Sequence, residues 1–205
     1  MSQIALPLSR PGADGPPRIV VGNANAAAVE ALANSAVWPF RTAVLSGPPR
    51  SGKSLLARWF AESTGGDVID NAETLDETAL FHRWNRAQET ATPLLLVSNA
   101  APGEWRIALP DLASRLGAAL HLEIGSPDDA MLAELIAVHA EIRGLVLDNS
   151  AAAYLVPRCE RSHLGVERLV AAIDRLSLER KVPPGMAIWR DALEEIIGEI
   201  QPRLL

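Results

Sequence analysis

The chain has 205 residues, of which 48% are hydrophobic and 21% are charged, a balance typical of a folded globular protein. Its 19 basic and 25 acidic side chains give a formal net charge of −6, which excludes general binding to nucleic acid through clustered lysine and arginine. No apolar run approaches the roughly 20 residues that cross a bilayer, and no export signal is visible, so we expect a cytoplasmic protein that does not contact the membrane. The single cysteine, Cys159, excludes an internal disulfide.

Residues 1–17 are rich in proline and glycine, which predicts a flexible tail. Within it, a glutamine is followed by spaced aliphatic side chains, a pattern that fits an apolar groove on another protein. A plain disordered tail is the alternative interpretation. The candidate partner-binding residues are Gln3, Ile4, Leu6, Pro7 and Leu8.

Residues 47–54 fit the P-loop pattern G-x-x-x-x-G-K-[ST] at every fixed position. An apolar run, 42–46, precedes them and a helical pattern follows, which is the strand–loop–helix context that the motif needs. The backbone N–H groups of such a loop bind phosphate oxygens, Lys53 adds a positive charge, and the Ser54 hydroxyl is a ligand for Mg²⁺. The predicted nucleotide-contacting residues are Gly47, Pro48, Pro49, Arg50, Ser51, Gly52, Lys53, Ser54 and Leu55.

A short β-branched run precedes the P-loop region. Its side chains, Ile19, Val20 and Val21, are candidates for an apolar wall against the nucleotide base. A place in the hydrophobic core explains them equally well.

Within residues 67–71, the aliphatic side chains of Val68 and Ile69 are followed by an acid, the form of a Walker B strand in which Asp70 holds Mg²⁺ through water. A surface aspartate at a strand end is the alternative. From Ser54 to Asp70 is 70 − 54 = 16 positions, too few for a further strand and helix between the two motifs. Either the sheet is trimmed here, or the Walker B strand is a neighbouring one.

A buried strand at 93–99 ends in Ser98 and Asn99, which places these polar side chains at the ligand-binding edge of a parallel sheet. A short helix at 109–116 carries Arg115, which on sequence alone is a charge near a helix end. A last strand is expected at 119–124.

From residue 126 onward the pattern is helical, with predicted helices at 128–143, 150–159, 165–179 and 186–200. The sequence therefore predicts an α/β nucleotide-binding domain, 18–125, with a parallel sheet and flanking helices. A small all-α lid domain, 126–205, is predicted to follow.

In order along the chain, these motifs resemble those of the Hda-like regulators in the DnaA branch of the AAA+ proteins. The resemblance is carried by the run at 19–25, the P-loop at 47–54, the V-I-D-N run at 68–71 and the stretch L-P-D-L-A-S-R-L at 109–116. The tail segment 3–8 also resembles the family's sliding-clamp-binding motif.

The resemblance assigns roles to several of these residues. It implies that Asp70 is the Mg²⁺-associated acid, that Asn99 is a sensor of the γ-phosphate, and that Arg115 is an arginine finger acting in trans. It implies Arg168 as the lid sensor, with Arg161 as the second candidate.

The resemblance further implies ADP or ATP with Mg²⁺ as cofactors, and DnaA as the partner whose ATP is hydrolysed. The tail would bind the sliding clamp, the β subunit of DNA polymerase III, with DNA contacted indirectly through the clamp; a homodimer is compatible with it. The expected outcome is negative regulation of the initiation of chromosome replication. The short gap before Asp70 and the absence of a basic helix-turn-helix region argue against an initiator that binds the origin.

Asn71 occupies the position where AAA+ proteins that hydrolyse ATP carry an acid. An amide cannot accept a proton near pH 7, so we expect weak or absent intrinsic turnover. Glu73 would substitute if it reached the attacking water.

Two other classes of function stay open. An ATP-hydrolysing AAA+ motor or loader in DNA replication needs a competent base, which Asn71 is not. A small-molecule P-loop kinase needs arginines in a mobile lid, whereas Arg158, Arg161 and Arg168 fall in an ordinary helical pattern.

Overall fold

The computed structural model describes residues 18–100 and 104–200, which form two compact units. Residues 24–125 belong to the first, and residues 18–23 and 126–200 to the second. The candidate clamp-binding residues of the tail lie outside the described part of the chain. No helix in that part is both long enough and apolar enough to cross a membrane.

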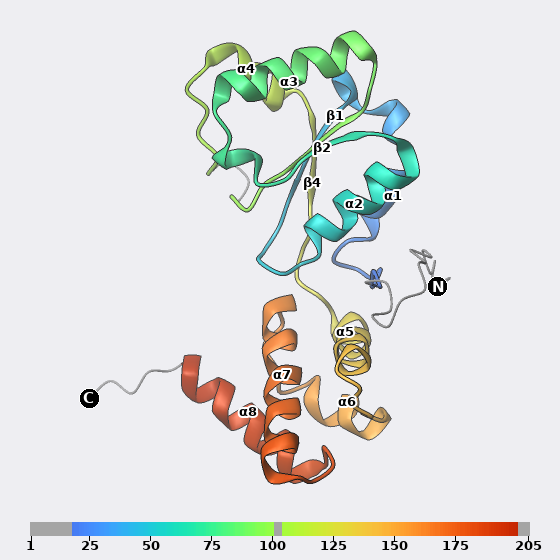
Figure 1. Cartoon of the computed structure of the whole chain (residues 1–205), viewed down its shortest axis with the longest axis vertical. Helices are drawn as coiled ribbons and strands as arrows, with labels where there is room; N and C mark the ends of the chain where they lie inside the picture. The colour runs from blue at the N-terminus through green and yellow to red at the C-terminus, as the bar shows by residue number, and fades with distance from the viewer. Residues whose placement is uncertain (1–17, 101–103, 201–205) are drawn as a thin grey trace, which may run out of the picture. The chain divides into compact units, whose positions relative to one another are not determined.

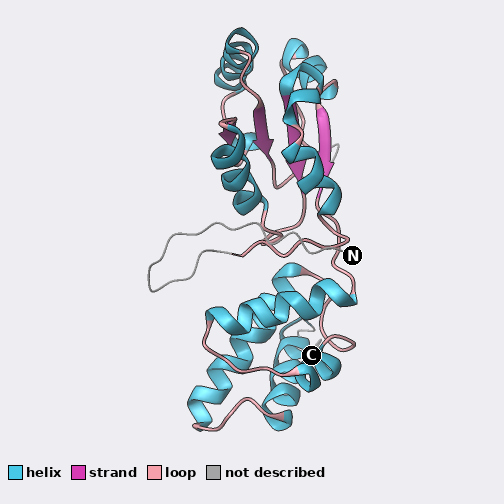
Figure 2. Ribbon diagram, turned by 90° about the vertical axis from the view of Figure 1, so that its right-hand side faces the viewer, coloured by secondary structure: helices cyan, strands magenta, loops and turns pink. Residues whose placement is uncertain are grey.

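The first unit is built on a four-stranded parallel sheet (Figures 1 and 2). Its strands are β1 (Thr42–Ser46), β2 (Asp67–Ile69), β3 (Leu94–Val97) and β4 (Leu120–Glu123), in the order β2-β3-β1-β4. Thr42 is in register with Leu94, and Ala43 with Leu120. Every residue of β1 and β3 is buried, as expected for central strands with both faces covered. The predicted α/β fold with flanking helices is confirmed.

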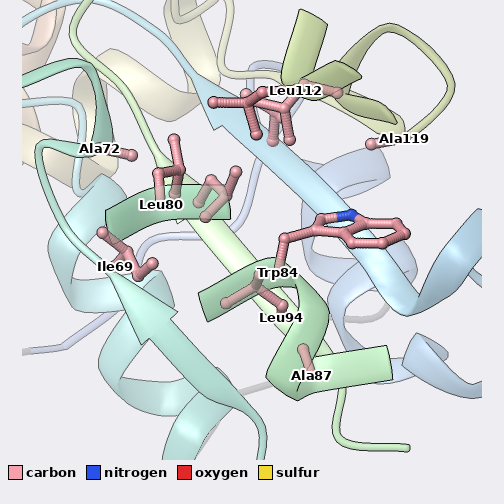
Figure 3. Close-up of a cluster of buried hydrophobic side chains, with 11 residues drawn as sticks. Ile69, Ala72, Leu80, Trp84, Ala87, Leu94, Leu112 and Ala119 are labelled. Carbon is pink, nitrogen blue, oxygen red and sulfur yellow. The ribbon is translucent and has the colours of Figure 1, made fainter. Parts of the chain in front are cut away.

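Helices cover both faces of the sheet (Figure 1). On one side, α1 (Ala26–Ala33) packs against β4, and α2 (Lys53–Thr64) packs against β2 and β3. On the other lie α3 (Glu77–Thr90) and α4 (Pro110–Gly117), whose apolar side chains form one cluster with alternate residues of the strands (Figure 3). The cluster contains Val44, Ile69, Ala72, Leu80, Trp84, Ala87, Leu94, Leu96, Leu112, Leu116 and Ala119.

The sheet is trimmed next to the P-loop helix. α2 ends at Thr64, Gly65 closes it with a φ of 71°, and β2 begins at Asp67, so no further element separates them. β2 pairs with β3, and β3 with β1. Of the two alternatives that the short spacing left open, the described part of the chain shows the trimmed sheet.

The helix before the P-loop strand is short. α1 ends at Ala33, because Asn34 turns its side-chain amide back to the Glu30 carbonyl and the indole N–H of Trp38 donates to the Ala31 carbonyl at 2.8 Å. Two short 3₁₀ turns, Ser35–Val37 and Pro39–Arg41, then lead into β1.

The second unit consists of α5 (Asp129–Ile142), α6 (Asn149–Leu155), α7 (His163–Arg180) and α8 (Met186–Ile200). Side-chain oxygens of Asp128, Asp148 and Ser162 cap α5, α6 and α7. α7 packs against α5 and α8. It begins two residues before the predicted start at Gly165, because the Ser162 hydroxyl accepts a hydrogen bond from the Gly165 N–H and so places the cap earlier.

The run that the sequence assigned to the α/β domain, 18–23, joins this second unit. The Asn23 side chain donates to the Ser126 carbonyl at 3.2 Å and accepts from the Asp128 N–H at 2.9 Å. Gly22 lies so close to Met131 that an added Cβ would come within 2.9 Å of its sulfur. These contacts fix the run against the start of α5.

Candidate nucleotide-binding site

The P-loop motif joins the end of β1 to the start of α2. Gly52 is the N-cap of α2 and has a φ of 86°, a left-handed conformation that glycine adopts without steric cost. Gly47 has a φ of 154°, and a Cβ there would lie 2.9 Å from Cβ of Ile124. The motif's first glycine is therefore required by a close approach to the end of β4.

Lys53 is the first residue of α2 and is 6% exposed. Its Nζ donates to the carbonyl oxygens of Gly47 at 2.7 Å and Pro48 at 2.9 Å. Burial lowers the pKa of Lys53 below 10.5, and the negative charges of Asp70 and Glu73 partly oppose that change. The ammonium group thus lies inside the loop, within electrostatic reach of two carboxylates.

Two hydroxyl groups complete the loop. Ser51 is buried, and its Oγ has no hydrogen-bond partner among the described residues. Ser54, in the first turn of α2, is exposed. An orphaned hydroxyl, a buried ammonium group and the N-terminus of a 12-residue helix together fit a bound phosphate group.

Polar side chains gather at the carboxyl ends of β2 and β3. The Asn99 side-chain nitrogen donates to Oδ1 of Asn71 at 2.7 Å, and the Asn99 backbone N–H donates to Oε1 of Glu73 at 3.0 Å. Asp70 directly follows β2, is exposed, and accepts from the Asn71 N–H at 3.0 Å. Because Mg²⁺ is usually held by one or two protein oxygens, phosphates and waters, Ser54 and Asp70 suit the metal role predicted for them.

Asn71 has a φ of 52°, the left-handed region, where asparagine is better tolerated than most residues. It begins a short 3₁₀ turn, Ala72–Thr74, which carries Glu73 back beside Asn99. The sequence named Glu73 as an alternative base, and the structure brings it into this group of polar side chains.

Arg115 lies on α4 and packs against α3. Its guanidinium carbon is 4.4 Å from the ring centroid of Phe81 and 4.2 Å from that of Trp84, and Nη1 donates to Oδ1 of Asn85 at 2.5 Å. The side chain is half-buried. Among the described residues, none of its contacts is with the P-loop.

Two residues that the sequence analysis did not predict, Asn85 and Glu77, stabilise Arg115 and the start of its helix. Asn85 binds the guanidinium group, and the Glu77 carboxylate accepts hydrogen bonds from the N–H groups of Ala108 and Leu109 at the start of α4. The i, i+4 spacing of Phe81 and Asn85 on one helical face was the available signal.

The predicted apolar wall and the two lid-sensor candidates belong to the second unit. Val20 is buried, while Ile19 and Val21 are half-buried. Arg168 is exposed on α7, and Arg161 forms an ion pair with Asp129 at 2.6 Å.

Solved structures share this arrangement. Domain III of the replication initiation protein DnaA from Thermotoga maritima matches with a TM-score of 0.72 at 15% identity, over 87% of this chain and 95% of that one. The fold is that of the AAA+ ATPases. The T. maritima RuvB Holliday junction branch migration motor matches with a TM-score of 0.64 at 18% identity, over 85% of this chain and 69% of that one. AMPPCP-bound DnaA from Aquifex aeolicus matches with a TM-score of 0.58 at 20% identity, over 80% and 66%. No family model matches the sequence.

Within the AAA+ fold, the strand order brings the candidate residues to one edge. The strand that leads to Asp70 lies beside the strand that leads to Asn99, which lies beside the P-loop strand. An acid, an amide and a lysine therefore gather at the carboxyl ends of three adjacent parallel strands, where ligands bind in open α/β sheets.

Proposed function

We propose that this chain is an Hda-like AAA+ adaptor in the control of chromosome replication. It binds ADP or ATP with Mg²⁺ in its P-loop, docks through its tail on a DNA-loaded sliding clamp, and stimulates hydrolysis of the ATP that DnaA holds. The outcome is that re-initiation is limited. The observation that carries the proposal is Arg115, a half-exposed arginine fixed on α4 whose contacts are with α3 and not with its own P-loop.

Binding of nucleotide is supported by the loop itself. Lys53 is already enclosed by carbonyl oxygens, and Ser51 has an unused hydroxyl. A bound phosphate group would accept hydrogen bonds from the Lys53 ammonium group in place of these carbonyl oxygens, and from the N–H groups at the N-terminus of α2. One of the AAA+ structures with this fold, the Aquifex DnaA, contains the ATP analogue AMPPCP.

The contacts of Arg115 support the proposed action in trans. A finger places a fixed positive charge beside the γ-phosphate, where negative charge spreads in the transition state, and such residues raise rates by about 10³–10⁵ in related NTPases. Ring contacts with Phe81 and Trp84 and the bond to Asn85 restrict the guanidinium group before any partner arrives. Preorganisation of this kind suits a residue that completes the active site of a neighbour.

In this proposal, the tail brings the chain close to DnaA by binding the sliding clamp. A six-residue motif binds a groove only modestly, but attachment to a clamp raises the local concentration of the chain near DNA-bound DnaA. The test is a pull-down on the sliding clamp with the wild type and with Gln3→Ala combined with Leu6→Ala. Loss of capture in the double variant is expected; equal capture would remove the clamp from the proposal.

The finger assignment is tested with Arg115→Ala. We expect it to retain clamp binding but to lose stimulation of DnaA-bound ATP hydrolysis by about 10³-fold or to background. Arg86→Ala is the matched control, because Arg86 is an exposed arginine on α3. Full stimulation by Arg115→Ala would overturn the assignment.

An ATP-driven motor or loader is the second candidate, and the Glu73 carboxylate beside Asn99 favours it. Steady-state turnover separates the two classes. A rate of about one per second or faster would favour the motor.

A further inference from the structure

We propose that Glu73 is the acid that activates water for hydrolysis of this chain's own ATP, an inference that rests on the proposed binding of nucleotide in the P-loop. The chain then has an intrinsic activity of its own, beyond its action on a partner. It would convert bound ATP to ADP and inorganic phosphate.

One oxygen of the Glu73 carboxylate is fixed and the other has no partner. Oε1 accepts from the Asn99 backbone N–H at 3.0 Å, while Oε2 is buried and without a hydrogen bond among the described residues. A buried carboxylate oxygen that lacks a donor is unfavourable, so the site calls for a molecule that can donate to it. Water is such a molecule.

The carboxylate that carries this oxygen interacts electrostatically with the P-loop lysine, Lys53. The charge of Glu73 raises the pKa of Lys53 against the lowering caused by burial, which means that the carboxylate lies within electrostatic reach of the ammonium group. That ammonium group is the one that contacts the β- and γ-phosphates in P-loop proteins. The geometry agrees, because Glu73 accepts from Asn99 at the end of β3, and β3 lies beside the P-loop strand β1. A water held by Glu73 would therefore lie at the edge of the sheet where the P-loop begins.

The other polar side chains at this edge of the sheet have roles that exclude them as the base. The Asn71 side chain is an amide, and its Oδ1 accepts from Asn99. Asp70 is exposed at the end of β2 and suits the metal ion. Among the described residues of the group at the ends of β2 and β3, Glu73 is the acid left to act as a base.

The reaction is a simple hydrolysis. As the water oxygen bonds to the γ-phosphorus, Oε2 of Glu73 accepts a proton from that water. The bond from the γ-phosphorus to the β,γ-bridging oxygen breaks, and its electron pair stays with ADP. Inorganic phosphate leaves, and the proton passes from Glu73 to solvent.

The test uses Glu73→Gln in the full-length chain, which keeps an acceptor for the Asn99 N–H but cannot take the proton. We expect single-turnover hydrolysis of radiolabelled ATP to fall by about 10²-fold or more, with ATP affinity unchanged within about threefold. Glu89→Gln, at an exposed position in the last turn of α3, is the matched control and should behave as the wild type.

A second measurement does not depend on turnover in the assay. The nucleotide released by denaturing each purified protein is identified by chromatography; we expect ADP from the wild type and ATP from Glu73→Gln. A Glu73→Gln variant that binds and hydrolyses ATP as the wild type does would overturn this inference alone. So would a wild type that binds ATP but hydrolyses it no faster than Lys53→Ala. A wild type that binds no nucleotide would instead overturn the proposed function.

Discussion

The start of the helix that carries Arg115 depends on one carboxylate, and its removal should be measurable. Leu109 is the N-cap of α4, and Pro110 follows it. The leucine side chain cannot accept a hydrogen bond, so it leaves the N–H groups at the start of the helix without a side-chain cap. Glu77, in the first turn of α3, accepts instead from the Ala108 N–H at 2.8 Å and the Leu109 N–H at 2.7 Å. We therefore predict that Glu77→Ala destabilises the first unit.

The magnitude follows from those two bonds. Hydrogen bonds to a charged group contribute about 1.5–3 kcal/mol each when shielded, and the loss of a helix N-cap costs about 1 kcal/mol. Both bonds of Glu77 are exposed to water, which replaces part of what is lost. We expect Glu77→Ala to lower the free energy of unfolding of the first unit by about 2 kcal/mol and its midpoint of thermal unfolding by about 8–16 °C. Glu77→Gln retains one acceptor and should lose about half as much.

Urea unfolding followed by tryptophan fluorescence is the suitable assay. Of the five tryptophans, Trp38, Trp59, Trp84 and Trp105 lie in the first unit, so the signal reports mainly on it. Glu89→Ala, an exposed glutamate at the other end of α3, is the control. If the two alanine variants differ by less than about 0.5 kcal/mol, Glu77 does not support α4 as we argue.

Three further predictions concern the nucleotide site. Gly47→Ala should lose about 1–3 kcal/mol of stability and weaken binding of a fluorescent ADP analogue in titrations, because its Cβ would meet Ile124 at 2.9 Å; unchanged stability and affinity would show that the loop adapts. ADP affinity should fall as the pH rises through the pKa of Lys53, which burial lowers, since the protonated form binds phosphate. The same titration of Lys53→Arg should be flat at alkaline pH, and a parallel fall in both proteins would assign the effect to another group. Asn71→Asp, introduced together with Glu73→Gln, should restore single-turnover hydrolysis by about tenfold over Glu73→Gln alone, because it returns a carboxylate to the water. No gain would mean that position 71 does not face the water.

Local sequence patterns were sufficient for the sheet and for the P-loop. β1 was predicted from its apolar run. The glycines and the lysine that follow it are typical of a loop that leads into a helix, and α2 begins there. The fold followed because the same strand–helix alternation continues through β3 and β4.

Contacts between distant residues could not be predicted in this way. The capping of α4 by Glu77 joins groups 31 and 32 positions apart, and the bond from Arg115 to Asn85 spans 30. Run 18–23 was assigned by its neighbours along the chain, whereas Asn23 binds residues 103 and 105 positions away. Such pairings depend on how α3, α4 and α5 pack, and hydrophobic periodicity does not encode them.

The backbone at position 71 restricts which acids this chain can use. A left-handed φ of 52° favours asparagine, aspartate or glycine over a longer side chain, so a glutamate directly after Asp70 would be strained by about 1–2 kcal/mol. Two residues later, the 3₁₀ turn returns to ordinary backbone geometry, and there a glutamate fits. Substitution of asparagine by aspartate at position 71 is therefore the smallest evolutionary step by which a chain with this turn could gain a second acid at the site, and the reverse substitution is the smallest step by which it could lose one.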